Sequence, residues 1–343
     1  MVYKKIIIVY DCIKEKNDKY WLGNGIKKIQ KPENVIEIYS KKQSLSRMKT
    51  SGKFGKLKAI IEMLKICIST IKKSSQEDLI IIWGNEQALI FNELISILHI
   101  KRRIISFGWL NPRKGKVSFL RKKCLKNEHF IALTNSKKAI DDWKRIFNLP
   151  KANVLYFPDT YDINDKFTKY NNKKDKYVFS GGFSSRDWEK FLQIVKKLPN
   201  IKFKCIAHRN QWDKNWGIPK NLEVKFNTST DEYYDELKNS YCSLFVCVPN
   251  LNAGLINVIK SMQYSVIPLI TFNDSVKEYY PKKYSGYLIK DNAVSLFVEN
   301  IEKIYSLSER EYKKIVDDLQ ENLKEKYNSE KLIEDLIRYI EKN

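Results

Sequence analysis

Residues 177–188, YVFSGGFSSRDW, decide the fold that this sequence predicts. A short apolar run ends in two glycines, small polar residues follow, and an arginine opens a helix-patterned segment. The glycines allow close backbone approach, the serines offer hydroxyls and a helix N-cap, and the arginine offers a charged fork that matches phosphate oxygens. The stretch therefore predicts a strand-to-helix turn that binds an anion. The residues that carry this prediction are Gly181, Gly182, Ser184, Ser185 and Arg186.

A second turn of the same kind lies at residues 244–260. The strand-like run LFVCV leads into PNLNAG and then into the helix-patterned INVIKSM. Two anion-ready turns in one half of the chain suggest a nucleotide diphosphate as the ligand.

Strand and helix patterns alternate outward from these turns over the whole chain. Such alternation predicts mainly parallel sheets with helices on both faces, an α/β fold with two doubly wound domains. Strands are expected at 5–10, 35–39, 79–83, 103–107, 130–134, 154–157, 177–180, 203–207, 222–226, 244–248, 266–270 and 287–289. The clearest helices are expected at 56–73, 87–98, 136–147, 187–197, 231–240, 255–264 and 293–306.

The polar, lysine-rich stretch 159–176 interrupts this alternation and marks a domain boundary. We expect an N-terminal domain at 1–165, a linker at 166–176 and a C-terminal domain at 177–308. The charged, periodic stretch 309–343 is expected to add two closing helices.

Charge and composition favour some functions and argue against others. The chain has 63 basic and 40 acidic residues, a net charge of +23, which favours an anionic partner, although a genome-wide bias toward lysine explains it equally well. The six cysteines show no C-x-x-C spacing and predict reduced core thiols. The three histidines are scattered, which argues against a zinc site. No apolar run is long enough for a signal core or a membrane span, so the sequence predicts a cytoplasmic protein.

The second half resembles the donor-binding domain of GT-B glycosyltransferases. The matching segments are SGGFSSRDW, DELKNSYCSLFVCVPN and AGLINVIKSMQYSVIPLI. The resemblance implies two Rossmann-like domains that face each other across a cleft, with the acceptor in the first and a nucleotide-sugar in the second. It also implies that Arg186 faces the diphosphate, and that the amides of Ala253, Gly254 and Leu255 face the distal phosphate.

The pattern is most similar to the retaining, bacterial surface-polysaccharide type, with one departure. Those enzymes carry two glutamates around the later helix, one touching the donor sugar and the other the ribose. Asn252 and Lys260 stand at these positions here. Asn252 can hydrogen-bond sugar hydroxyls and is a catalytic candidate, whereas Lys260 would reach the ribose or a phosphate.

Further donor-side candidates follow other strands of the second half. His208 and Arg209 come at the carboxyl end of a predicted strand, where open α/β sheets bind ligands, although a solvated loop is an equal alternative. Asn227 follows the next strand and, with Phe226, could frame a base, although packing is the better role for Phe226. Asn257 is a further candidate for nucleotide or sugar.

In the first half, Asp11 follows the first strand and is the carboxylate best placed to act as general base in an inverting transfer. A role in a turn or helix cap is a slightly better explanation for it. A glycine-rich loop and the end of a buried strand could line the acceptor site. These acceptor-side candidates are Gly23, Asn24, Gly25, Trp83, Asn85 and Glu86.

The sequence contains no Asp-x-Asp motif, the pair that metal-dependent transferases of the other common fold use. The resemblance thus predicts a metal-independent hexosyltransferase without a cofactor, with a nucleotide-diphosphate sugar, most simply a UDP-sugar, as donor. The acid-free, basic and aromatic segment 101–126 suggests an anionic membrane surface as partner, and the helix 56–73 could join it or simply face the core. We therefore expect a peripheral protein on the inner face of the cell membrane, with a lipid-linked or growing surface-polysaccharide acceptor.

Two other functions remain open from the sequence. A nucleotide-sugar epimerase of similar architecture would use the same donor site without an acceptor. A basic nucleic-acid-binding protein would explain the charge, but the chain shows no RNA-binding motif and its charge is spread over both halves, so no nucleic acid is expected.

Overall fold

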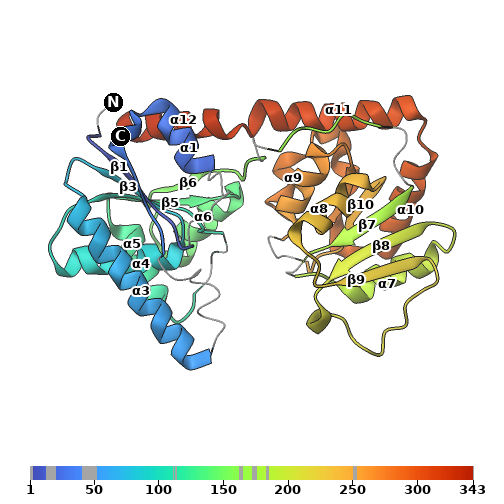
Figure 1. The fold of residues 1–343 in the computed structure, drawn as a ribbon, viewed down its shortest axis with the longest axis horizontal. Helices are drawn as coiled ribbons and strands as arrows, with labels where there is room; N and C mark the ends of the chain where they lie inside the picture. Colours follow the sequence, from blue (N-terminus) through green and yellow to red (C-terminus); the bar gives the residue numbers. More distant parts are fainter. Residues whose placement is uncertain are drawn as a thin grey trace. The chain divides into compact units, whose positions relative to one another are not determined.

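The computed structural model describes residues 3–12, 21–40, 52–110, 112, 114–161, 165–171, 176–182, 185–249 and 253–342. The chain forms two compact units, Met1–Pro158 together with Ser329–Asn343, and Asp159–Asn328 (Figure 1). Each unit is a parallel β-sheet covered by helices on both faces, as the sequence predicts.

The first unit contains a six-stranded sheet in the order β2-β1-β3-β4-β5-β6. Every described strand pair in it is parallel. Its central strands are runs of isoleucine, leucine and valine that are buried on both faces, the pattern expected of a covered parallel sheet. The strands are β1 (Ile6–Val9), β2 (Val35–Ile38), β3 (Leu79–Ile82), β4 (Arg103–Ser106), β5 (Phe130–Thr134) and β6 (Val154–Tyr156).

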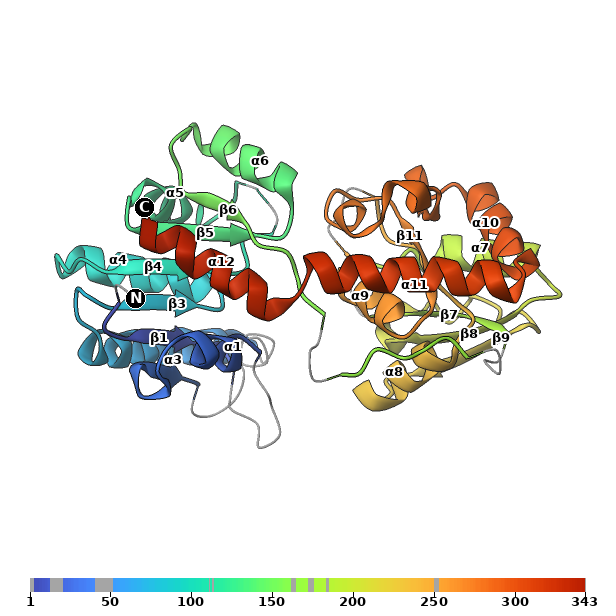
Figure 2. The same cartoon turned by 90° about the horizontal axis from the view of Figure 1, so that it is seen from above.

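Two groups of helices cover this sheet (Figure 2). On one face, α1 (Trp21–Ile29) packs with α12 (Ser329–Lys342). The helices of the other face are α3 (Gly52–Lys73), α4 (Asn85–Ile97), α5 (Ser118–Lys126) and α6 (Lys137–Phe147).

The second unit has a six-stranded sheet in the order β12-β11-β10-β7-β8-β9, again with parallel pairs throughout the described strands. The strands are β7 (Tyr177–Gly181), β8 (Lys202–Ala207), β9 (Leu222–Phe226), β10 (Cys242–Phe245), β11 (Ile267–Thr271) and β12 (Leu288–Ile289). The helices are α7 (Trp188–Lys197), α8 (Thr230–Asn239), α9 (Leu255–Gln263), α10 (Val294–Ser306) and α11 (Glu309–Lys326). Short 3-10 turns occur at Pro32–Asn34, Arg209–Gln211, Val276–Tyr279, Lys282–Tyr287 and Lys290–Asn292.

The division between the units differs from the boundaries expected at 165 and 309. The segment after Pro158 already belongs to the second unit, where the Thr168 amide donates to the Gln263 carbonyl and Tyr170 packs on Tyr312. The two closing helices separate, because α11 packs on α9 whereas α12 returns to the first unit. The polar composition of residues 159–176 indicated where this stretch begins, but it did not indicate that the stretch packs on the second unit.

Strand order reverses at one place in each sheet. In the first unit the chain runs from β1 to β2 on one side and then to β3 on the other, and in the second it runs from β7 through β8 and β9 and then back to β10. The carboxyl ends of strands at such a reversal form the usual ligand crevice of open α/β sheets. Ligand-binding residues are therefore expected at the β1/β3 and β7/β10 reversals.

Candidate functional site

The turn after β7 places Arg186 at the β7/β10 reversal. Gly182 has a φ of +126°, and a side chain there would collide with the Arg186 guanidinium. The Arg186 Nε–H donates to the Gly181 carbonyl at 2.9 Å, and Nη1 lies 3.2 Å from the Cys247 sulfur. The guanidinium also lies over the Phe245 ring, 5.5 Å from its centroid. These contacts fix the arginine at the strand ends.

Backbone hydrogen bonds join this turn to the second predicted turn. Arg186 forms an antiparallel bridge with Cys247. The Val248 amide donates to the Ser185 carbonyl, and the Asp187 amide donates to the Val246 carbonyl, each at 2.9 Å. The two anion-ready turns of the sequence therefore lie side by side.

The helix α9 begins beside the same arginine. Gly254, its N-cap, has a φ of +84°, and a Cβ added there would lie 2.6 Å from the Ile270 side chain and 3.3 Å from the Cys247 sulfur. Cys247 thus lies between the Arg186 guanidinium and the start of α9. Because the first amides of a helix lack intrahelical partners, the Leu255 end of α9 and Arg186 present positive charge at one edge.

The N-cap of α7 is Asp187, whereas the sequence predicted a serine in that role. The Asp187 side chain accepts from the Lys190 amide at 3.1 Å, and Trp188, the first residue of α7, is buried. Ser185 precedes the cap in a left-handed conformation, with a φ of 54°. Ser184 and Asn252 lie outside the described residues, so their predicted contacts stay predictions.

A buried network that the sequence did not reveal holds the turns in place. The Cys247 amide donates to the Thr271 hydroxyl at 2.9 Å, and the Asn292 side chain donates to the Cys247 carbonyl at 2.8 Å and to the Asp187 carboxylate at 3.1 Å. The Thr271 hydroxyl in turn donates to the Asn292 side-chain oxygen. Burial raises the pKa of the Cys247 thiol, although Arg186 partly offsets it, so Cys247 is a neutral packing residue.

The other donor-side candidates meet at the same edge, at the ends of β8 and β9. The His208 Nδ1 and Asn227 Oδ1 atoms are 2.9 Å apart, and the Arg209 amide donates to the same oxygen at 3.4 Å. The Arg209 guanidinium stacks over Phe226 at 4.6 Å from the ring centroid. Asn227 has a φ of 54°, which asparagine tolerates better than most residues. The structure thus brings His208, Arg209 and Asn227 together.

Lys260 is occupied by an ion pair. It is buried, and its Nζ lies 2.8 Å from Asp165 Oδ2, while Tyr264 donates to the same carboxylate. Burial opposes ionisation of Asp165, but the hydrogen bonds from Lys260 and Tyr264 outweigh it and lower its pKa. The ion pair therefore attaches the segment around Asp165 to α9. Asn257 stays half-buried in the first turn of α9.

In the first unit, Asp11 lies at the β1/β3 reversal. Its Oδ2 would be 3.3 Å from a Cβ at Gly84, the residue that precedes α4. Trp83, at the end of β3, stacks on Phe107 with ring centroids 5.0 Å apart and packs on the core. Asn85 and Glu86 begin α4. Asp11 thus lies beside the start of a helix, which suits both a cap and a base.

The glycines of residues 23–25 lie within α1. A side chain at Gly23 would collide with Glu37, and one at Gly25 would lie 2.5 Å from Ile333 of α12. The glycines therefore let α1 approach the sheet and α12 closely, and the expectation that they form an acceptor loop is wrong in that respect. Asn24 is exposed on this helix.

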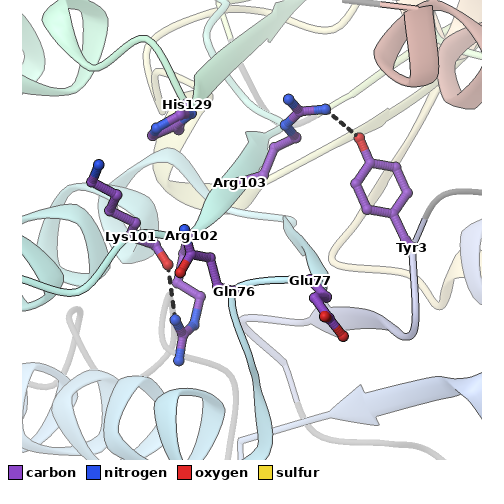
Figure 3. A pocket seen from close by; sticks show the side chains of 7 residues that line it. All are labelled: Tyr3, Gln76, Glu77, Lys101, Arg102, Arg103 and His129. Carbon is purple, nitrogen blue, oxygen red and sulfur yellow. Dashed lines mark hydrogen bonds between the residues drawn. The ribbon is translucent and has the colours of Figure 1, made fainter.

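A pocket of about 320 Å³ lies at the opposite, amino-terminal end of the first sheet (Figure 3). Its arginines are engaged within the protein. Arg102 donates to the Ser74 hydroxyl and carbonyl, and Arg103 donates to the Tyr3 hydroxyl at 2.8 Å. The arginines of this pocket therefore serve structural contacts, and we do not assign the pocket to the functional site.

Two kinds of feature are absent from the part of the chain that the structure describes. That part holds no group of three or more His, Cys, Asp or Glu side chains able to bind a metal ion. It also holds no helix both long and apolar enough to cross a bilayer.

Comparison with solved structures identifies the fold. An alpha,alpha-trehalose-phosphate synthase (UDP-forming) from Burkholderia vietnamiensis aligns over 100% of this chain and 99% of its own, with a TM-score of 0.71 and 9% identity. HepE from Anabaena, in complex with UDP and glucose, aligns over 99% and 100%, with a TM-score of 0.68 and 11% identity. A trehalose-6-phosphate structure from E. coli, bound with UDP-2-fluoro glucose, aligns over 97% and 98%, with a TM-score of 0.69 and 11% identity.

No protein-family model and no curated protein sequence matches the chain. The structural likeness covers both units and confirms the predicted GT-B fold of two Rossmann-like domains. At such low identity the likeness establishes the fold alone.

Proposed function

We propose that this chain is a glycosyltransferase that moves a sugar from a nucleotide-diphosphate sugar, most simply a UDP-sugar, to a lipid-linked or growing surface-polysaccharide acceptor. The observation that carries the proposal is the β7/β10 edge, where Arg186 and the start of α9 are held together through Cys247. The edge combines a guanidinium with the first amides of a helix, an arrangement that binds phosphates.

The same edge supports departure of the diphosphate. Negative charge develops on the leaving phosphate during sugar transfer, and fixed donors aimed at it stabilise the transition state. Arg186 is pre-positioned by its bonds to the Gly181 carbonyl and the Cys247 sulfur, so little reorganisation is needed. We propose that these donors act without a protein-held metal.

His208, Arg209 and Asn227 extend the edge toward the nucleoside. Their side chains offer donors and acceptors for a base or ribose, and the Arg209–Phe226 stack gives the group a rigid, planar wall. HepE and the E. coli structure were solved with UDP or a UDP-sugar, which supports uracil as the first base to test.

Proton removal from the acceptor depends on the stereochemical course. In a retaining transfer the leaving phosphate itself can accept the proton. In an inverting transfer a base is required on the opposite face of the sugar, and Asp11 is the candidate. Its position at the β1/β3 reversal supports that role.

The positive charge of the first unit supports a lipid-linked acceptor. The segment 101–126 is strongly basic, and Lys114, Lys116 and Lys122 within it are exposed together with Phe119. Such a surface suits a peripheral protein at the inner face of a membrane, next to a lipid-linked acceptor.

The test is a ligand panel in the presence of EDTA. UDP, GDP, CMP and their sugars are added to the full chain, and the apparent melting temperature is recorded. We expect one diphosphate and its sugars to stabilise the protein. Incubation of that sugar nucleotide without acceptor should leave the sugar unchanged, since an epimerase would isomerise it. Stabilisation by none of the ligands contradicts the proposal.

A further inference from the structure

The helix α3 of the first unit is apolar on two opposite faces. One face is buried against the unit, where Ala59 and Met63 pack on Ile90 of α4. The buried members of this face are Ala59, Met63, Ile66, Cys67 and Thr70.

The other face of α3 carries large apolar side chains that are exposed. Leu57, Ile61, Leu64 and Ile68 recur every three or four residues and so form one stripe along the helix. Phe54 lies at its beginning and Ile60 beside it, and the exposed fractions of the six side chains range from 37% to 81%. From the sequence alone this stripe could have been the core-facing side. The structure instead turns the face that holds Ala59, Cys67 and Thr70 inward, where α3 packs on α4.

The exposed charged side chains that the structure describes on α3 are all positive. Lys58, Lys65 and Lys72 recur every seven residues and follow one edge of the stripe, and Lys56 and Lys73 are exposed as well. The acid of α3, Glu62, is buried. Among the α3 side chains that the structure describes, the exposed charges are therefore all lysines.

We propose that the outer face of α3 docks on the surface of an anionic lipid bilayer. Contiguous exposed apolar side chains mark an interaction surface rather than ordinary solvent exposure. A helix lying in the bilayer interface buries its apolar side chains below the headgroups, while its lysines extend to the lipid phosphates. Each lysine near an anionic surface adds attraction.

The lysines also decide against a second copy of this chain as the occupant. Two α3 stripes packed against each other would bring two rows of lysines together, and like charges along such a seam disfavour pairing. An anionic surface supplies the missing complement.

The inference rests on α3 alone and not on the sugar-transfer reaction. It also goes beyond the general basic character of residues 101–126, because it names the surface that would enter the interface. If transfer to a lipid-linked acceptor is correct as well, α3 would place the first unit at the membrane that holds that acceptor.

The experiment measures sedimentation of the full chain with vesicles of phosphatidylcholine alone or mixed with phosphatidylglycerol. Wild type should bind the mixed vesicles, and the variant Leu57→Gln/Ile61→Gln/Leu64→Gln should bind them at least about tenfold more weakly, because three apolar side chains no longer enter the interface. The matched control Ile218→Gln/Leu296→Gln alters two exposed apolar residues of the second unit and should bind like wild type.

A second variant tests the charge. Lys58→Gln/Lys65→Gln/Lys72→Gln should weaken binding about tenfold or more at low salt, and added salt should narrow that gap. Circular dichroism and the melting temperature check that each variant folds, and UDP binding, recorded separately, reports on the proposed transfer function. Full vesicle binding by the Leu57/Ile61/Leu64 variant overturns the inference. So does a dimeric wild type that this variant converts to monomer while vesicle binding stays unchanged.

Discussion

The two sheets reverse strand order in the same way but present opposite chemistry at the reversal. At β7/β10 the edge carries Arg186 and the start of α9. At β1/β3 it carries Asp11, beside Gly84 at the start of α4. A cationic edge suits a diphosphate, whereas a carboxylate suits a neutral, hydroxyl-rich ligand.

The difference shows how topology and side chains divide the work. Parallel sheets with this strand order place loops and helix starts at one edge whatever their sequence. Only the residues in those loops determine which ligand binds. Substitution of the side chains at one edge should therefore change ligand binding there and leave the other unit intact.

The largest expected effect comes from the acidic edge. For an inverting transfer, Asp11→Asn should lower the rate of sugar transfer at least about 100-fold, because removal of a general base typically costs that much. The affinity for UDP should stay unchanged, since Asp11 belongs to the other unit. Steady-state transfer kinetics with calorimetry of UDP binding provide the measurement. The control Asp141→Asn alters an exposed carboxylate of α6 in the same unit. Transfer at the wild-type rate by Asp11→Asn would remove Asp11 as the base.

A smaller effect is expected at the glycine that makes room for the arginine. Gly182→Ala should weaken UDP binding about tenfold, because the new methyl group displaces the Arg186 guanidinium and the φ of +126° disfavours alanine. Gly217→Ala is the matched control, since no atom lies within 4 Å of a Cβ at that position. Equal UDP affinities for the two variants would show that the guanidinium does not need this space.

The smallest effect is on stability alone. Asp165→Asn should lower the free energy of unfolding by about 1 kcal/mol at neutral pH, because it removes the partner of the buried Lys260, while UDP binding is unaffected. The folded-state pKa of Asp165 is lowered, so its contribution is complete above its ordinary pKa of about 4 and is lost as the pH falls through the lowered value. Chemical unfolding of wild type and variant from pH 7 downward measures the difference. A gap that widens in acid would contradict the ion pair.

Regular structure could be predicted because it follows local patterns. All twelve strands that the structure describes overlap the ranges that apolar runs predicted.

Features that depend on long-range packing could not be predicted. Thr271 and Asn292 look like ordinary strand-end and loop residues, yet they hold the Cys247 turn through contacts far apart in sequence. The orientation of α3 depends on which of two apolar faces fits α4, which periodicity cannot decide. Lys260 matched a ligand position in the resemblance, but its partner Asp165 comes from a segment that composition marked only as polar.

The most direct test of the account is the affinity of the full chain for UDP, measured by titration calorimetry in wild type, Arg186→Ala and Arg310→Ala. Arg310 is an exposed arginine of α11 in the same unit and controls for the loss of one charge. We predict that Arg186→Ala weakens binding by about 10- to 100-fold, as expected for a charge-assisted hydrogen bond to phosphate, while Arg310→Ala binds like wild type. Equal affinity of Arg186→Ala and wild type would contradict the assignment of the β7/β10 edge as the diphosphate site.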